Sequence, residues 1–179
     1  NRIKVVDATM LCEGVAVARA SAVMLRQSDE PHGRVWNAPE PPMVDPATLV
    51  PRERPEATER DRAWDTRIAG GGFGTGERME AWLRQLCPTV AGIEPSPFVR
   101  AAGASDFAHP TTNSGDSGLS YINADITLYL HRAPVGEWFG FRSVSHENAE
   151  GVAVGEAAVF DEVGAVGRAT VCGITNRRR

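Results

Sequence analysis

Asp106 is the residue of this chain best placed to act as a general base. It falls late in a predicted helix, where the helix dipole disfavours a negative charge, yet on the face expected to meet a sheet. A carboxylate that reaches a water molecule beside a carbonyl carbon can take a proton from that water. The alternative is that Asp106 only hydrogen-bonds the loop expected after it, Phe107 to Gly118.

Asn123 and Cys172 are two further candidates for a site with Asp106. The amide of Asn123 can orient a water molecule or a carbonyl, although it is neither a nucleophile nor a base. Its alternative role is that of an ordinary polar residue on the open face of a strand. Cys172 lies between Val171 and Gly173 with no basic residue nearby in the sequence, a setting more typical of a small buried apolar side chain than of a thiolate.

Histidines provide another possible chemistry, because a Cys172–histidine pair could act as nucleophile and base. His131 stands beside Arg132 and Pro134 at the end of a predicted strand, and His146 is isolated in the sequence. Both histidines are therefore interpreted as structural.

The helix that carries Asp106 has a well-marked start. Ser96 is typical of an N-cap, and Pro97 suits the first helical position, where no N–H is needed. The small residues that follow would let a sheet approach the helix closely. Helical spacing places on one face Phe98, Ala102, Ser105 and Asp106.

Strands are predicted on both sides of this helix. Residues 121–131 alternate, with a predicted buried face formed by Ile122, Ala124, Ile126, Leu128 and Leu130. Other strands are predicted at 64–68, 79–86, 138–145, 152–160 and 166–175. With no second helix, this order predicts an α+β fold with mainly antiparallel pairing.

An internal repeat organises the chain. A shift of 149 positions aligns a hairpin near the start, with a turn near Glu13-Gly14, onto the last predicted hairpin. Residues 27–63 are rich in proline and charge, which predicts an inter-repeat linker that runs extended over the surface. The expected division is a final hairpin of an incomplete first unit at 1–26, the linker at 27–63 and a domain at 64–179. The start on Asn1, directly in a strand, indicates missing sequence upstream.

Composition narrows the classes of function. A net charge of -4 and a pI near 5.6 provide no basic face for nucleic acid. The three cysteines lie far apart without zinc-site spacing, so no metal is expected. The glycines of residues 70–76 are interpreted as a strand connection, because no Lys-Ser/Thr and no helix follow them. No signal peptide or long apolar run is present, which predicts a cytoplasmic protein without membrane insertion.

Several short motifs together resemble a known superfamily. They are Ala104-Ser105-Asp106-Phe107, Tyr121-Ile122-Asn123-Ala124-Asp125, His131-Arg132-Ala133-Pro134 leading to Glu137-Trp138, and Phe160-Asp161. In this order they resemble the double-hotdog, thioesterase-like superfamily related to acyl-CoA thioesterase II. The resemblance covers residues 65–179 well, and residues 1–26 as the tail of the first hotdog. It implies a curved antiparallel sheet wrapped around a central helix, and hydrolysis of fatty acyl-CoA without a cofactor.

The resemblance also implies a site made of Asp, Thr and Gln around a water molecule. Position by position, the Asp falls on Asp106, the Thr on Asn123 and the Gln on Cys172, so one of the three residue types is retained. The expected function is an acyl-CoA thioesterase. The alternatives are a non-catalytic acyl-CoA or acyl binding protein and, ranked lower, an enoyl-CoA hydratase. Either a segment upstream of Asn1 or another chain is expected to cover the strand edges at residues 1–26, and homo-oligomerisation is expected on this ground.

Overall fold

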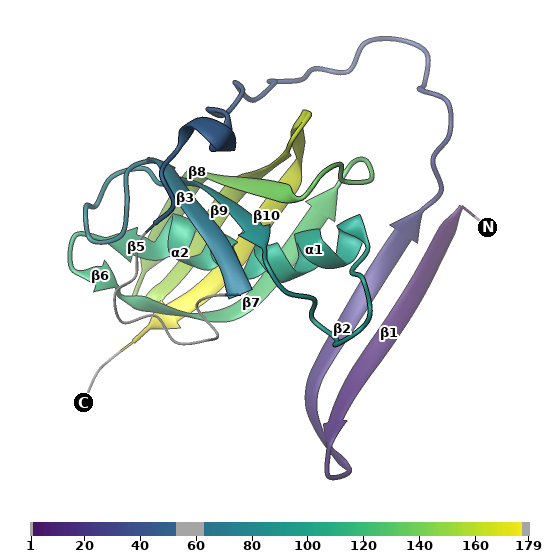
Figure 1. Ribbon diagram of the computed structural model, residues 1–179, viewed down its shortest axis with the longest axis horizontal. Coiled ribbons are helices and arrows are strands. Elements are labelled where there is room, and N and C mark those ends of the chain that lie inside the picture. Colours follow the sequence, from purple (N-terminus) through teal and green to yellow (C-terminus); the bar gives the residue numbers. More distant parts are fainter. Residues whose placement is uncertain (1, 53–62, 177–179) are drawn as a thin grey trace. The chain divides into compact units, whose positions relative to one another are not determined.

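The structure is a computed structural model that describes residues 2–52 and 63–176. It comprises two compact units, Asn1–Ala38 and Pro39–Arg179. The elements are β1 (Ile3–Cys12), β2 (Val15–Leu25), η1 (Pro46–Thr48), β3 (Trp64–Gly70), β4 (Glu80–Gln85), α1 (Pro97–Ala104), η3 (Ser105–Phe107), α2 (Ala108–Asn113), β5 (Ser114–Gly115), β6 (Gly118–Leu119), β7 (Tyr121–Leu130), β8 (Trp138–Ala149), β9 (Val152–Asp161) and β10 (Gly164–Thr175), where η marks a 3-10 turn (Figure 1). Each predicted strand is thereby confirmed.

The first unit is an antiparallel hairpin of β1 and β2. Glu13 and Gly14 at its tip have φ values of 50° and 82°. Positive φ at both central residues is the geometry of a tight two-residue hairpin turn, which confirms the predicted turn.

The register of this hairpin is repeated in β9 and β10. In the first hairpin a bulge lies between Met10 and Leu11, with Val17 as the extra residue of β2. In the second, Val166 is the extra residue of β10, at the position that a shift of 149 predicts from Val17. The two hairpins therefore agree in pairing as well as in composition.

The second unit contains a sheet of six strands in the order β3-β4-β8-β9-β10-β7, and every pairing in it is antiparallel. The helices α1 and α2 lie against one face of this curved sheet (Figure 1). The predicted α+β class is confirmed. The order places β7, which follows the helices in sequence, at one end of the sheet beside β10.

The helix starts as predicted, but it continues further than predicted. Ser96 accepts a hydrogen bond of 3.3 Å from the Val99 N–H, and Pro97 is the first helical residue. The expected loop from Phe107 is wrong, because η3 and α2 continue the helical run to Asn113. Pro110 permits this, since it lies in the first turn of α2, where its missing N–H has no intrahelical partner to lose.

The predicted buried face of the helix is also wrong, except at Ser105. The buried side chains are those of Ala101, Ala104, Ser105 and Ala108, whereas Phe98, Ala102 and Asp106 are exposed. The reason is packing: Phe139 and Phe141 of β8 fill the space below the helix, and alanines leave room for their rings.

The other face of the sheet has a smaller core around Trp82, Ala158 and Phe160. It is covered by residues 40–50, which we call the strap. The indole N–H of Trp82 donates to the Val44 carbonyl at 2.8 Å, and Met43 and Leu49 pack on the aromatic rings.

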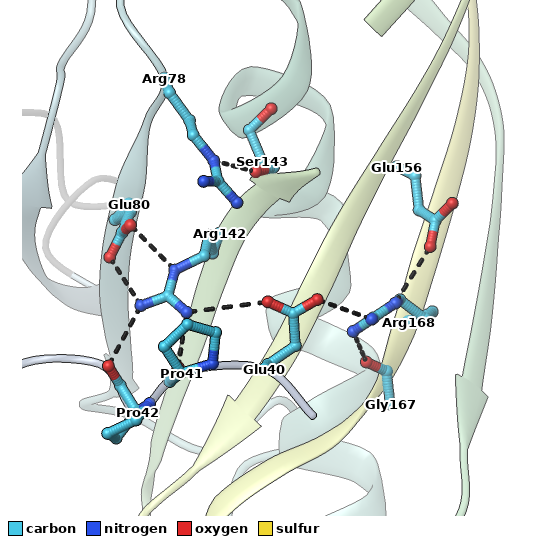
Figure 2. Close-up of polar contacts among 10 residues, drawn as sticks. All are labelled: Glu40, Pro41, Pro42, Arg78, Glu80, Arg142, Ser143, Glu156, Gly167 and Arg168. Carbon is cyan, nitrogen blue, oxygen red and sulfur yellow. Dashed lines mark hydrogen bonds and ion pairs between the residues drawn. The ribbon is translucent and has the colours of Figure 1, made fainter. Parts of the chain in front are cut away.

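Arginines bind the strap to the sheet. Arg142, almost fully buried, donates to the carbonyls of Pro41 at 2.6 Å and Pro42 at 3.2 Å and forms an ion pair with Glu80 at 2.8 Å (Figure 2). Glu40 of the strap lies between Arg142 and Arg168 and contacts Arg168 at 2.7 Å. A second arginine, Arg67, donates to two carbonyls further along the strap, those of Pro46 and Leu49.

Candidate active site

Asp106 and Asn123 meet in the structure. The Asn123 Nδ2 donates a long hydrogen bond of 3.4 Å to the Asp106 Oδ1. Asp106 comes from the turn η3 and Asn123 from β7, so the contact joins the helix to the end strand of the sheet. Both side chains are exposed, which leaves room for a small molecule beside them.

A β-bulge in β7 aims Asn123 at Asp106. The predicted alternation from residue 122 to residue 130 is wrong in its first part, because Cys172 pairs with Asp125 while its neighbour Gly173 pairs with Asn123. Ala124 is thus an extra residue, and it moves Asn123 to the helix-facing side of the sheet while Ile122 turns to the opposite side. A bulge that redirects a side chain in this way is common next to functional sites.

His109 is a buried group beside Asp106 that the sequence interpretation missed. The His109 Nε2 lies 3.1 Å from the Tyr121 carbonyl oxygen. Because a carbonyl oxygen can only accept a hydrogen bond, this nitrogen carries the proton. Burial lowers the pKa of His109, while the hydrogen bond to Tyr121 and the charge of Asp106 act in the opposite direction. The net lowering favours a neutral imidazole. His109 follows Asp106 by three residues, a spacing that places two side chains next to each other on a helix. The pair could have been predicted from the sequence only if this segment had been recognised as helical.

Cys172 does not join Asp106 and Asn123. Its neighbour Val171 belongs to the core under the helix. Successive side chains of a strand point to opposite faces, so the Cys172 side chain projects from the far face. The Cys172 N–H donates to the Asp125 Oδ1 at 3.2 Å on that same side. His131 is exposed at the end of β7, and the structure gives it no contact with Cys172.

Arg132 and Asp161, which belong to two of the other sequence motifs, form a buried ion pair. Asp161 is 1% exposed and binds Arg132 through both oxygens, with Oδ1 2.7 Å from Nη2. It also accepts the N–H groups of Val135 at 2.9 Å and Val163 at 3.0 Å. Burial alone would raise the pKa of Asp161, but the hydrogen bonds from Arg132, Val135 and Val163 and the charge of Arg132 together lower it below the ordinary value. These residues hold together the loops at the ends of β7 and β9.

Residues 22–170 match the family described as the acyl-CoA thioesterase C-terminal domain. This chain belongs to that family. The match covers most of the chain, including Asp106, His109 and Asn123. No match was found among curated proteins.

Solved structures share the fold of this acyl-CoA thioesterase domain. A hotdog-fold protein of unknown function from Alicyclobacillus acidocaldarius matches with a TM-score of 0.70 and 17% identity, covering 100% of this chain and 69% of its own. A provisionally assigned thioesterase from Novosphingobium aromaticivorans matches with a TM-score of 0.70 and 21% identity, covering 98% of this chain and 68% of its own. The acyl-CoA thioesterase II TesB2 from Mycobacterium marinum matches with a TM-score of 0.56 and 15% identity. The match covers 98% of this chain and 69% of the TesB2 chain. These structures confirm the hotdog fold, and the family match confirms the predicted superfamily.

No helical segment in the described parts of the chain has the length and hydropathy needed to cross a membrane. Within residues 2–52 and 63–176, no three His, Cys, Asp or Glu side chains gather as metal ligands would.

Proposed function

We propose that this protein hydrolyses the thioester of fatty acyl-CoA to a free fatty acid and CoA, with Asp106 as the general base. The contact between Asp106 and Asn123 carries the proposal, because it joins a proton acceptor to an amide that can hold a water molecule or a carbonyl. Membership of an acyl-CoA thioesterase family supports the choice of substrate.

The proposed reaction needs no cofactor. Asp106 takes a proton from the water molecule as the water oxygen attacks the thioester carbonyl carbon. The oxyanion that forms collapses, the carbon–sulfur bond breaks, and the thiolate of CoA takes the proton back from Asp106. Asn123 orients the water molecule throughout, while the neutral His109 donates to the Tyr121 carbonyl and holds the start of β7 against the helix.

The experiment is a thiol-release assay with acyl-CoAs of short, medium and long chain. Asp106→Asn should lower kcat by about 100-fold or more, because it removes the proton acceptor and keeps the shape. Asp116→Asn, the same change at an exposed aspartate in the turn between β5 and β6, is the matched control. Hydrolysis that persists unchanged in Asp106→Asn would contradict the assignment of the base.

The position of Cys172 supports a second candidate, a protein that binds acyl groups or acyl-CoA without turnover. With its side chain on the far face of the sheet, Cys172 does not supply the third group that the resemblance implies. Saturable binding of acyl-CoA with no thiol release at any chain length would favour this function.

The position of His109 supports a third candidate, an enoyl-CoA hydratase. A histidine on the central helix beside a carboxylate could add water to a double bond by general acid–base chemistry. Loss of enoyl-CoA absorbance without release of thiol would favour this function over hydrolysis.

Homo-oligomerisation is part of the proposal. In the hairpin of β1 and β2, apolar side chains such as Ile3, Val5, Leu11 and Val15 are more than half exposed. Two strands alone are marginally stable in water, so a further surface is expected to cover them. Light scattering of the purified protein should give at least twice the mass of one chain, and a monomer would contradict this.

A further inference from the structure

His109 forms one of the two hydrogen bonds that join the helical run of α1, η3 and α2 to β7 among the described residues. The His109 Nε2 donates to the Tyr121 carbonyl at 3.1 Å, and the other bond is the one between Asn123 and Asp106. Asp106 and His109 are three residues apart, about 5 Å along the helical axis. Tyr121 and Asn123 are two residues apart, about 6.6 Å along the strand. The two bonds therefore lie side by side and connect the same two elements.

The start of β7 has few other anchors. Among the described strands, β7 is the last in the sheet order, so it pairs with β10 alone. The bulge at Ala124 follows Asn123 directly, and a bulge disrupts the ladder of hydrogen bonds locally. Residues 121–123 thus form a short strand end beyond the bulge. The bond from His109 connects this strand end to the helix.

The His109 bond acts on the backbone of β7. Its acceptor is a main-chain carbonyl, so the bond does not depend on the side chain of Tyr121. His109 is only 8% exposed, and burial lowers its pKa, which favours a neutral imidazole with its single proton on Nε2. Because the donor is shielded from water, its hydrogen bond is stronger than the same bond at the surface.

We propose that His109 is a positioning residue of the hydrolysis proposed above, on which this inference rests. Through the Tyr121 carbonyl, His109 sets the position of the strand end. This position in turn fixes the distance between the Asn123 amide and the Asp106 carboxylate. A small displacement of reacting groups lowers the rate strongly, because proximity and orientation supply a large part of catalysis. The loss is expected in kcat rather than in KM, because Asn123 orients the water molecule and not the acyl chain.

The test compares substitutions of His109 in the thiol-release assay. His109→Leu removes the donor and keeps a similar volume, whereas the amide nitrogen of His109→Gln can still donate from near the position of Nε2. We expect kcat to fall about tenfold in His109→Leu with KM changed less than about twofold, and His109→Gln to retain most of the kcat. His109→Asn, whose amide is too short to reach the Tyr121 carbonyl, is a second variant in case His109→Leu does not fold. A wild-type kcat in either folded variant would overturn the proposal.

Thr111→Val is the matched control for a lost hydrogen bond in the same helix. Thr111 is buried, and its Oγ1 donates to the Phe107 carbonyl at 2.7 Å, so the bond stays within the helical run and does not reach β7. Urea unfolding should show a loss of stability in Thr111→Val, while kcat stays unchanged. A loss of kcat as large as that in His109→Leu would show that any weakening of the helix slows the reaction, and this would overturn the positioning role.

A double-mutant cycle tests whether His109 acts through Asn123. Residues that act through one another have effects that do not add. In the Asn123→Ala background, His109→Leu should therefore lower kcat by less than about twofold. A further tenfold loss in this background would show that His109 acts independently of Asn123 and would contradict the proposal.

An NMR measurement separates this proposal from the proposed reaction. The side-chain amide signals of Asn123, assigned by their loss in Asn123→Ala, should shift in His109→Leu and stay in place in His109→Gln and Thr111→Val. Such shifts without any thioester hydrolysis by the wild type would support the positioning of Asn123 by His109 and contradict the catalytic proposal. Signals that stay in place in His109→Leu would overturn the positioning role, whether or not the protein hydrolyses thioesters.

Discussion

Asn123 reaches the Asp106 carboxylate because the strand that carries it contains one extra residue, Ala124. The bulge turns Asn123 toward the helix, where its Nδ2 lies 3.4 Å from the Asp106 Oδ1. This single bulge in the backbone thus brings the side chains of two candidate catalytic residues into contact.

Asn123→Ala should lower kcat of the proposed hydrolysis by about tenfold to 100-fold, because a hydrogen bond to a charged group is lost. The measurement is steady-state thiol release from acyl-CoA. Thr127→Ala is the control, since Thr127 is exposed on the opposite face of the same strand. Equal kcat in wild type and Asn123→Ala would show that Asn123 has no part in the reaction.

The stability of the wild type should decrease as the pH falls below about 6.5, the pKa of a histidine in an unfolded chain. Burial lowers the pKa of His109 in the folded state. As the pH falls, the unfolded state therefore binds a proton at this histidine at a higher pH than the folded state does, and this binding stabilises the unfolded state. Urea unfolding between pH 7.5 and 5 measures this loss. In His109→Gln the decrease should be smaller, because one titrating group has been removed. An identical pH dependence in the two proteins would contradict a buried neutral His109.

Asp161→Asn should destabilise the fold by about 3 kcal/mol at pH 7, because it removes the charged partner of Arg132. The pKa of Asp161 is lowered in the fold, so its contribution is present above the unfolded pKa of about 3.9 and is lost as the pH falls through the folded value. Urea unfolding at pH 7 and at pH 3 should show a smaller difference between wild type and variant at the lower pH. A difference that stays constant would mean that the carboxylate charge is not what stabilises these loops.

Arg142→Lys should loosen the strap while the helix and its sheet face remain folded. A lysine lacks the fork that lets Arg142 bond the carbonyls of Pro41 and Pro42 together with Glu80. Limited proteolysis within residues 40–50 should therefore become faster, with little change in the helical circular dichroism signal. Arg168→Gln is the control, because Arg168 is more exposed and contacts the strap only through Glu40. Unchanged cleavage in Arg142→Lys would show that the packing of Met43 and Leu49 is sufficient.

Local patterns in the sequence were enough to predict the class of fold. The cap formed by Ser96 and Pro97, the turn at Glu13-Gly14 and the runs of strand residues depend on neighbours in the chain, and the structure contains all of them. The helical continuation past Phe107 was not predicted. Pro110 does not prevent it, because a proline in the first turn of a helix costs no hydrogen bond.

Asp106 was selected from the sequence as a carboxylate late in a predicted helix. That reason does not hold in the structure, because η3 and α2 continue the helical run past Asp106 to Asn113. The contact of Asp106 with Asn123 depended on tertiary structure, since the bulge at Ala124 arises from pairing with β10, far away in the sequence. The same holds for the far-face position of Cys172 and the burial of His109. Periodicity predicts which residues share a face only while the strand is regular, and cross-strand pairing decides where that regularity ends.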